Sequence, residues 1–166
     1  AIAIRSIFIQ PFYIPSSSME PTLLIGDRLF VSKYSYGYSK HSFPFSPPII
    51  DGRVFSKKPK NGDVIVFKTP ADNRTDYIKR LIGLPGDTIQ FINGALLINS
   101  EIVKRVKIQN MQIIRCGNFN LKTNSFIEIL PNGIEHMVVY KKNGTLQNTK
   151  KFKVPKNHFF LLGDNR

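Results

Sequence analysis

Two side chains in this sequence, Ser18 and Lys79, could together carry out nucleophilic catalysis. Ser18 lies in a serine-rich segment bracketed by Pro15 and Pro21. Proline prevents a regular helix or an inner strand there, so we expect an exposed turn. A serine hydroxyl is a weak nucleophile until a base removes its proton, and a desolvated lysine can act as that base. A serine-rich segment beside proline is also typical of an ordinary turn, so Ser18 alone does not decide the function.

Lys79 lies inside the apolar run 77–84, which has the composition of a β-strand. Alternate side chains of a strand share a face, so Lys79 falls between Tyr77 and Leu81, while Arg80 points to the other side. An unperturbed lysine, with a pKa of about 10.4, is less than about 1% neutral at pH 8. Burial would lower this pKa, at a cost of roughly 3 to 4 kcal/mol for two to three pH units. The alternative is a lysine that extends to water.

Histidine is the rival base for Ser18. A triad of Ser18, His158 and Asp164 is compatible with the spacing, because triads assemble from distant positions. His41 and His136 are interpreted as structural or surface residues. The sequence has no HExxH, Walker, GxGxxG or EF-hand pattern, so we expect no metal and no cofactor.

Composition limits the classes of protein that this chain can be. Its 166 residues predict one domain, or one domain with a large insertion. The net charge of +13 favours an anionic partner such as a membrane surface or nucleic acid, or simply a solvated basic surface. Cys116 is the single cysteine, which excludes an internal disulfide and a CxxC zinc site, and we interpret it as a buried or idle thiol. No stretch reaches the roughly 20 apolar residues that span a bilayer.

Strand patterns dominate the chain and predict an all-β or mainly β fold. Asn93-Gly94 is a strong hairpin signal between two of these runs, and Asn143-Gly144 marks a second tight turn. The expected strands are 4–14, 27–34, 63–68, 77–84, 87–92, 95–99, 102–108, 111–115, 126–130, 136–142 and 158–162.

Two other regions have unusual compositions. Residues 41–50 combine three prolines with large apolar side chains, which predicts an apolar loop that either packs on the core or forms a lip against substrate or lipid. Residues 136–163 hold six lysines and no acid. Such lysines either protect sheet edges from aggregation or attract anionic lipid headgroups.

Four blocks of sequence occur along the chain, and their order is informative about its family. They are 14–23 (IPSSSMEPTL), 26–33 (GDRLFVSK), 62–67 with 76–87 (GDVIVF and DYIKRLIGLPGD), and 163–166 (GDNR). Together they cover 40 of the 166 residues, and they resemble the blocks of the type I signal peptidase family, the bacterial leader peptidases. The combination of all four is far more specific than any one of them.

This resemblance implies a serine endopeptidase that removes signal peptides from secretory preproteins. By the match, Ser18 is the nucleophile, Lys79 the general base, and Ser16 joins the backbone N–H of Ser18 in the oxyanion hole. The shallow substrate pockets, which accept small side chains in an A-x-A pattern, fall on Phe12, Ile14, Pro15, Met19, Leu23, Tyr77 and Ile78.

The family also implies an antiparallel β-sheet catalytic core with an inserted β-rich cap. We expect the core at residues 1–95 plus 156–166 and the cap at 96–155. The apolar start at Ala1 and the stop at Arg166 suggest a fragment, without an upstream membrane anchor and without a later serine that supports the lysine in the family. The implied location is the bacterial inner membrane, with the catalytic domain outside the cytoplasm. The expected partners are signal peptides and membrane lipid, with no nucleic acid.

Two other functions remain as alternatives. Self-cleaving repressor peptidases share a serine and lysine pair, but they also carry a DNA-binding domain, and no helix-turn-helix pattern is visible here. A basic β-module that binds a membrane or nucleic acid without catalysis would explain the charge, but not the blocks around Ser18 and Lys79. Substituting Lys79 with alanine would separate catalysis from surface binding.

Overall fold

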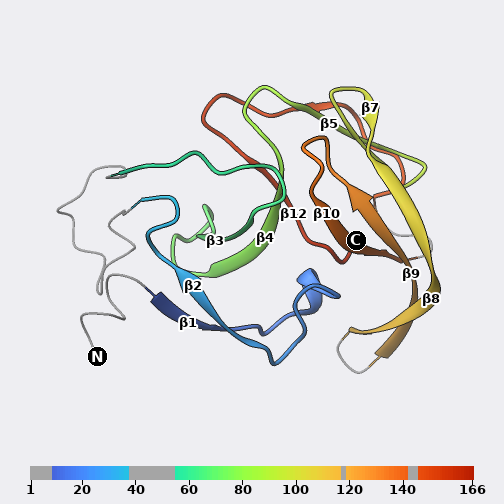
Figure 1. Cartoon of the computed structure of the whole chain (residues 1–166), viewed down its shortest axis with the longest axis horizontal. Coiled ribbons are helices and arrows are strands. Elements are labelled where there is room, and N and C mark those ends of the chain that lie inside the picture. Colours follow the sequence, from blue (N-terminus) through green and yellow to red (C-terminus); the bar gives the residue numbers. More distant parts are fainter. Residues whose placement is uncertain (1–8, 38–54, 117–118, 142–145) are drawn as a thin grey trace. The chain divides into compact units, whose positions relative to one another are not determined.

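The computed structural model describes residues 9–37, 55–116, 119–141 and 146–166, with no account of the side chains of 109–122 (Figure 1). The proline-rich loop at 41–50, the Asn143-Gly144 turn and the side chain of Cys116 lie outside the described part. Within it, two compact units are distinguished. Unit 1 comprises residues 1–14 and 26–59, and unit 2 comprises 15–25 and 60–166.

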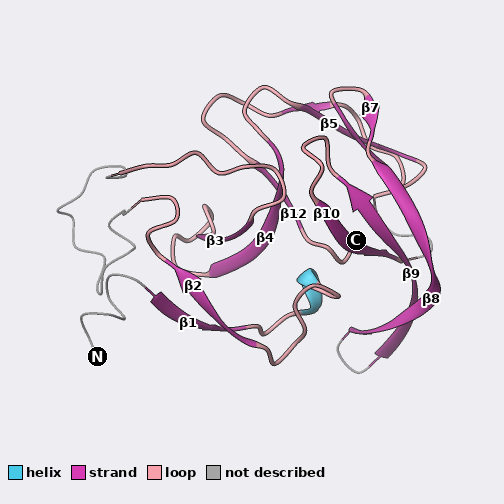
Figure 2. Cartoon of the chain, in the orientation of Figure 1, coloured by secondary structure: helices cyan, strands magenta, loops and turns pink. Residues whose placement is uncertain are grey.

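The prediction of a mainly β fold is confirmed (Figure 2). The paired strands run antiparallel, and the single short helix that is described is the 3-10 helix η1 (Ser17–Met19). The strands are β1 (Ile9–Tyr13), β2 (Arg28–Ser32), β3 (Val64–Lys68), β4 (Asp76–Gly83), β5 (Thr88–Ile92), β6 (Ala95–Ile98), β7 (Glu101–Ile102), β8 (Lys104–Cys116), β9 (Phe119–Ile129), β10 (Glu135–Tyr140), β11 (Phe152–Lys153) and β12 (Phe160–Leu162).

Unit 1 contains the two-stranded sheet β1-β2. Its register pairs Ile9 with Ser32 and Tyr13 with Arg28. Exposed and partly buried residues alternate along both strands, as expected of a ribbon with one solvent face. The backbone closes the ribbon with hydrogen bonds from Ile14 N–H to the Asp27 carbonyl and from Gly26 N–H to the Ile14 carbonyl.

Unit 2 contains three sheets. Strand β4 is the centre of the sheet β12-β4-β3, which carries Lys79. The second sheet has the order β11-β5-β6-β7, and the third has the order β10-β9-β8. An isolated parallel bridge between Val139 and Asn165 connects β10 to the segment that follows β12.

The predicted strands differ from the observed ones mainly in the long hairpin of unit 2. The runs 102–108 and 111–115 were expected as separate strands. Ile102 instead ends β7, whereas residues 104–108 and 111–115 both belong to β8, which keeps its pairing with β9 through a register shift between Ile108 and Gln112. The shift explains the apparent interruption, because an irregularity changes the alternation of side chains without ending the strand. The Asn93-Gly94 turn joins β5 and β6 as predicted. The short strand β11 and the helix η1 were not predicted.

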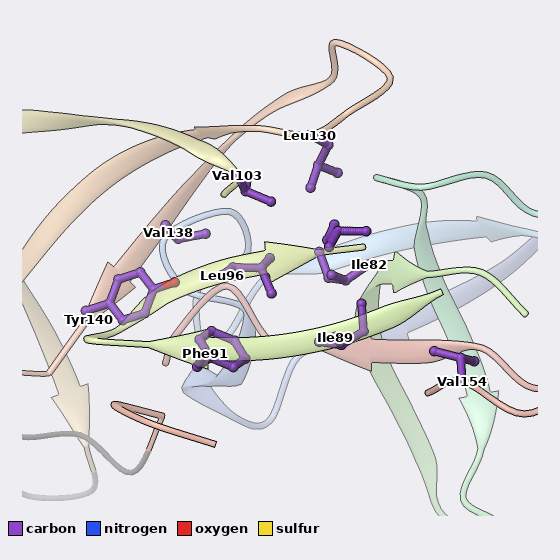
Figure 3. Close-up of a cluster of buried hydrophobic side chains, with 10 residues drawn as sticks. Ile82, Ile89, Phe91, Leu96, Val103, Leu130, Val138, Tyr140 and Val154 are labelled. Atoms are coloured by element: carbon purple, nitrogen blue, oxygen red, sulfur yellow. The ribbon is translucent and has the colours of Figure 1, made fainter. Parts of the chain in front are cut away.

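The main apolar core lies in unit 2 (Figure 3). It collects side chains from β4, β5, β6, β9 and β10 and their connections, which is why the hairpins fold against one another rather than remain single ribbons. Its fully buried members include Ile82, Leu96 and Val138. The neighbours that complete the cluster are Ile89, Phe91, Ile98, Val103, Leu130, Tyr140 and Val154.

Two expectations about organisation stay open. The division into a core at 1–95 plus 156–166 and a cap at 96–155 remains a prediction, although a boundary at 95 would fall inside the β5-β6 hairpin. In the residues that the structure describes, no helix is long and apolar enough to cross a membrane.

Candidate active site

The turn that carries Ser18 is short and well anchored. Ser16 is extended and precedes η1, which is held by a hydrogen bond from Glu20 N–H to the Ser17 carbonyl. Met19 points inward and is fully buried, and Leu23 N–H binds its carbonyl at 3.0 Å. Burying the side chain next to Ser18 leaves the serine itself partly exposed, as the proline-bracketed segment predicted.

The structure places Lys79 directly against Ser18. The Lys79 ammonium nitrogen lies 2.5 Å from Ser18 Oγ and 3.0 Å from the carbonyl oxygen of Ile78. Ser16 Oγ lies 3.3 Å from Ser18 Oγ. The Tyr77 ring is 5.7 Å from the same lysine nitrogen, which agrees with the predicted sharing of one strand face. The three residues Ser16, Ser18 and Lys79 therefore form one hydrogen-bonded cluster.

The electrostatics of Lys79 suit a general base. Burial lowers the pKa of Lys79, and the negative charge of Asp164 partly opposes this by raising it. Among the described residues, its hydrogen-bond partners are a hydroxyl and a carbonyl rather than a carboxylate. A lysine in this setting reaches its neutral form at a lower pH than a solvated one, and only the neutral form can accept a proton.

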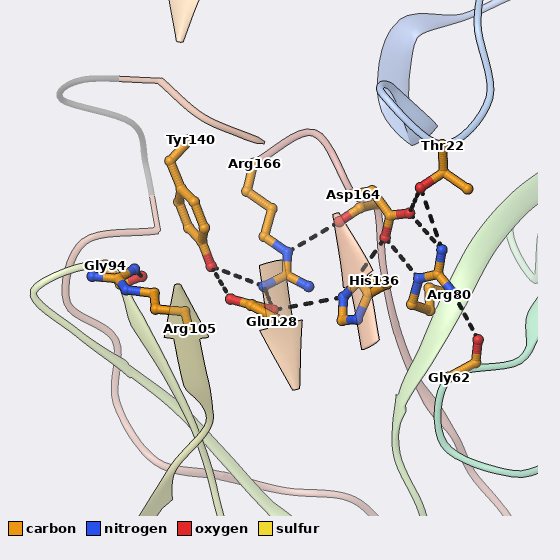
Figure 4. Close-up of polar contacts among 11 residues, drawn as sticks. Thr22, Gly62, Arg80, Gly94, Arg105, Glu128, His136, Tyr140, Asp164 and Arg166 are labelled. Atoms are coloured by element: carbon orange, nitrogen blue, oxygen red, sulfur yellow. Dashed lines mark hydrogen bonds and ion pairs between the residues drawn. The ribbon is translucent and has the colours of Figure 1, made fainter. Parts of the chain in front are cut away.

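Arg80, the next residue on β4, lies on the opposite face and is paired (Figure 4). Its Nε and Nη2 donate to the two carboxylate oxygens of Asp164 at 2.9 and 2.7 Å, and its Nη1 donates to the carbonyl of Gly62 at 2.8 Å. The side chains of Arg80 and Asp164 are both buried. This bidentate pair fixes the orientation of β4 and therefore the direction in which Lys79 points.

The segment after β12 holds the serine turn in place through hydrogen bonds to its carbonyl groups. Asn165 donates its backbone N–H to the Ser18 carbonyl at 3.3 Å and its side-chain amide to the Ser17 carbonyl at 3.0 Å. A Cβ on Gly163 would lie 2.2 Å from the Ser18 carbonyl oxygen. No other amino acid fits at this position unless the turn moves.

A second buried cluster extends away from Asp164. Glu128 accepts hydrogen bonds from Tyr140 and Arg166, both at 2.8 Å. His136 lies 3.6 Å from Glu128 and 4.0 Å from Asp164, distances at which a protonated imidazole would form ion pairs. Burial and the nearby arginines nevertheless lower the pKa of His136 to about 4, so we describe it as neutral at pH 7.

The histidine triad is not assembled. His158 is exposed, and its Nδ1 lies 2.9 Å from the carbonyl of Lys156. Asp164 is instead engaged with Arg80 and Thr22, so the sequence-compatible triad is wrong for this fold. Within the described ranges, no group of three or more histidine, cysteine or acidic residues could hold a metal ion.

The predicted pocket residues are distributed over both units. Pro15, Met19, Leu23, Tyr77 and Ile78 belong to unit 2 with Ser18 and Lys79, whereas Phe12 and Ile14 belong to β1 and its end in unit 1. Tyr77 is exposed and Ile78 partly buried beside Lys79, so both can meet a substrate there. Their binding roles stay predictions.

Sequence reasoning missed the residues that hold this site together. Thr22, Glu128, His136 and Arg166 were given no role in it, and Asp164 was considered only as a member of a triad. A usable signal was present in Arg80, because an arginine in an apolar strand requires a buried acid nearby. The alternation of Lys79 and Arg80 predicted two faces but could not identify the partner on the second.

Comparisons with known proteins identify the family of the chain. The profile of the family described as signal peptidase, peptidase S26, matches residues 1–166. The chain is 41% identical to Signal peptidase I of Rickettsia typhi and 42% identical to that of Rickettsia bellii, aligned in each case over the whole chain. It spans 65% and 59% of the length of these relatives, respectively. By this full-length family match, the chain belongs to the signal peptidase family, peptidase S26.

Proposed function

We propose that this protein is a serine endopeptidase that removes signal peptides from secretory preproteins. The observation that carries the proposal is the 2.5 Å contact between Ser18 Oγ and Lys79 Nζ, in a chain that belongs to the signal peptidase family. The relatives of similar sequence are named Signal peptidase I. The contact supplies a nucleophile and a base within proton-transfer distance of each other, which is the minimum for acyl transfer.

The reaction begins when neutral Lys79 takes the proton of Ser18. Ser18 Oγ then attacks the carbonyl carbon of the residue before the cut, and negative charge develops on the carbonyl oxygen. The Ser16 hydroxyl and the Ser18 backbone N–H stabilise this oxyanion, at about 3 to 4 kcal/mol per donor in comparable sites. Protonated Lys79 donates its proton to the leaving amine. Lys79 then activates a water molecule, which hydrolyses the Ser18 ester and releases the signal peptide.

The pairing of β4 leaves room for an extended substrate beside Lys79. Strand β3 pairs with residues 76–80 on one side of β4, whereas β12 pairs on the other side only with residues 80–83. Among the described strands, none covers that second side of Asp76–Lys79. A peptide that adds there as a strand would place its backbone next to the lysine, in the manner of β-augmentation.

The specificity that we propose is for small side chains before the cut, in the pattern A-x-A. A strand alternates its side chains, so the first and third residues before the cut point to the same side. Shallow apolar walls on that side admit alanine and crowd larger groups. The proposed wall residues are those of the predicted set that are at least partly exposed in unit 2, which carries Ser18 and Lys79: Pro15, Leu23, Tyr77 and Ile78.

The proposed location is the bacterial inner membrane, with the catalytic part outside the cytoplasm and in contact with lipid. The solvent face of the β1-β2 ribbon is mostly apolar, because Ile9, Pro11, Tyr13 and Phe30 are exposed on it beside Arg28 and Ser32. Phe30 is 78% exposed, which is costly in water and favourable in a bilayer. The net charge of +13 adds attraction to anionic headgroups. Replacing Phe30 with serine should weaken sedimentation with phosphatidylglycerol vesicles.

The test of the proposed activity is cleavage of a peptide that spans an A-x-A site. The protein in detergent micelles is incubated with the peptide, and the cut is mapped by mass spectrometry. Cleavage after the second alanine should be lost in Ser18→Ala and Lys79→Ala and kept in His158→Ala. No cleavage by the parent, or loss only in His158→Ala, would contradict the proposal and leave a triad hydrolase or a non-catalytic basic module.

A further inference from the structure

Thr22 connects the serine turn to the buried pair on the other face of β4. Its hydroxyl lies 2.5 Å from Asp164 Oδ2, to which it donates, and 3.4 Å from Arg80 Nη2 (Figure 4). Asp164 is fully buried, whereas Thr22 itself is an exposed residue on the loop that follows η1. A surface loop is thus held to a buried carboxylate by one hydroxyl group.

The position of Thr22 relates it to both reacting groups. Thr22 follows Ser18 by four residues, and the hydrogen bond from Leu23 N–H to the Met19 carbonyl closes the loop between them. Arg80 directly follows Lys79 on β4. One ion pair, Arg80 with Asp164, is therefore the common anchor of the turn that presents the serine and of the strand that presents the lysine.

We infer that Thr22 is a positioning residue that holds Ser18 in register with Lys79 by joining the serine turn to the Arg80–Asp164 pair. The inference rests on the proposed signal peptidase activity for its kinetic consequence. The geometry it describes is independent of the substrate. Thr22 touches no reacting atom, and its effect passes through the loop to Ser18 and through Asp164 to Lys79.

The same hydroxyl also affects the charge near the lysine. Asp164 raises the pKa of Lys79, against the larger lowering by burial. Among the described residues, Arg80, Thr22 and, at 4.0 Å, His136 face the Asp164 carboxylate, and the charges of Lys79 and Arg166 also interact with it. A hydrogen bond donated to a carboxylate reduces the negative potential that it projects on its surroundings. Without the Thr22 hydroxyl, Asp164 should hold Lys79 in its charged form up to a higher pH.

Other residues also hold the turn, so the contribution of Thr22 must be separated from theirs. Asn165 binds the carbonyls of Ser17 and Ser18, but it does so through the backbone and a side-chain amide of the segment after β12. Asn165 directly follows Asp164, so those bonds join the turn to the backbone beside the Arg80–Asp164 pair but not to its charged groups. The Thr22 hydroxyl contacts the side chains of both Asp164 and Arg80, so its removal should affect both the position of Ser18 and the pKa of Lys79.

The experiment compares three variants of the protein in detergent micelles. Thr22→Val removes the hydroxyl and keeps the shape, whereas Thr22→Ser keeps the hydroxyl. Thr75→Val is the matched control, because Thr75 Oγ1 also donates to a carboxylate at 2.5 Å, that of Asp72, in an exposed loop away from the serine turn. With an A-x-A peptide, Thr22→Val should lower kcat by about tenfold or more with little change in KM, as expected when reacting atoms are misplaced.

The pH dependence separates positioning from a general loss of folding. In Thr22→Val the acid limb of kcat should move to higher pH, whereas Thr22→Ser and Thr75→Val should match the parent. A variant that merely unfolds would lose amplitude without moving the limb. Equal kcat and an unmoved limb in Thr22→Val and the parent would overturn the inference.

A titration that needs no substrate tests the inference if the proposed activity fails. The Lys79 side-chain nitrogen signal is identified by its loss in Lys79→Ala and followed against pH by NMR. The pKa of Lys79 should be higher in Thr22→Val than in the parent, Thr22→Ser and Thr75→Val. A parent that cleaves nothing would overturn the proposed function alone, whereas identical Lys79 titrations in all four proteins would overturn the role of Thr22.

Discussion

The two neighbouring cations of strand β4, Lys79 and Arg80, lie on opposite faces and have different kinds of partner. On one face, Lys79 contacts a hydroxyl and a carbonyl, and burial lowers its pKa. On the other face, Arg80 is held by both oxygens of Asp164. The residues are adjacent in sequence, so the difference comes from their partners rather than from the strand. The partly buried lysine without a carboxylate partner suits a base, whereas the buried arginine with such a partner is a structural anchor.

The largest effect is expected from removing the base while keeping a cation. Lys79→Arg preserves positive charge on the first face, but arginine cannot give up its proton near neutral pH. We expect kcat for an A-x-A peptide to fall by more than about 10⁴-fold. The free energy of unfolding should change by less than about 1 kcal/mol, because the site is partly exposed. Measurable cleavage by Lys79→Arg would show that Lys79 acts only through its charge.

The second prediction breaks the anchor on the other face. Asp164→Asn leaves Arg80 buried without its countercharge, which we expect to cost about 3 to 5 kcal/mol of unfolding free energy. Urea unfolding followed by circular dichroism measures this loss. A change below about 1 kcal/mol would mean that water or another group compensates Arg80, and that the pair does not anchor β4.

The third prediction concerns the pH dependence of the free energy of unfolding. The buried side chain of His136 should dominate this dependence. Its pKa is lowered to about 4 in the folded protein, mainly by burial and then by the charges of Arg80 and Arg166. The negative charges of Asp164 and Glu128 act in the opposite direction. The unfolded chain, with a histidine pKa of about 6.5, therefore binds a proton first as the pH falls. Stability should be complete above about pH 6.5 and decline toward pH 4, by roughly 3 kcal/mol.

Urea unfolding at several pH values measures this decline in the parent and in His136→Gln. The glutamine variant keeps a polar side chain but cannot titrate. Its stability should vary less between pH 6.5 and 4 than that of the parent. Equal slopes in the two proteins would assign the pH dependence to other groups.

The smallest effect is expected from a partly exposed ion pair between β3 and β4. Lys68 and Asp76 are 2.8 Å apart, close to the 2.7 Å of the Arg80–Asp164 pair, but their side chains are about a third exposed. Asp76→Asn should cost less than about 1 kcal/mol, because solvent already screens the pair. Together with Asp164→Asn, the Asp76→Asn variant tests whether burial or distance determines how much an ion pair of β4 contributes to the free energy of unfolding.

The sequence predicted the first face of β4 better than the second. Composition and spacing indicated the strand, the alternation of Lys79 and Arg80, and the turn at Ser18, because these depend on local rules. The partner of Arg80 depends on how distant segments pack, and Asp164 lies 84 residues away. Local patterns therefore suggested a base but could not show that Asp164 is committed to arginine and threonine rather than to His158.

The fold shows the same limit. Alternation and the Asn93-Gly94 signal predicted a mainly β chain and the β5-β6 hairpin. The long strand β8 was divided because its register shift interrupts the alternation that the prediction used. Strand β11 has only two residues, and its pairing with β5 depends on a contact across about 60 residues of sequence rather than on a local pattern.

The measurement that tests the Ser18 and Lys79 account most directly is the pH dependence of kcat/KM for cleavage of an A-x-A peptide, in the parent and in His158→Ala. We predict an acid limb with an apparent pKa below the ordinary lysine value of about 10.4, unchanged in His158→Ala. A limb near pH 6.5 that disappears in His158→Ala would contradict the account, because histidine would then be the base.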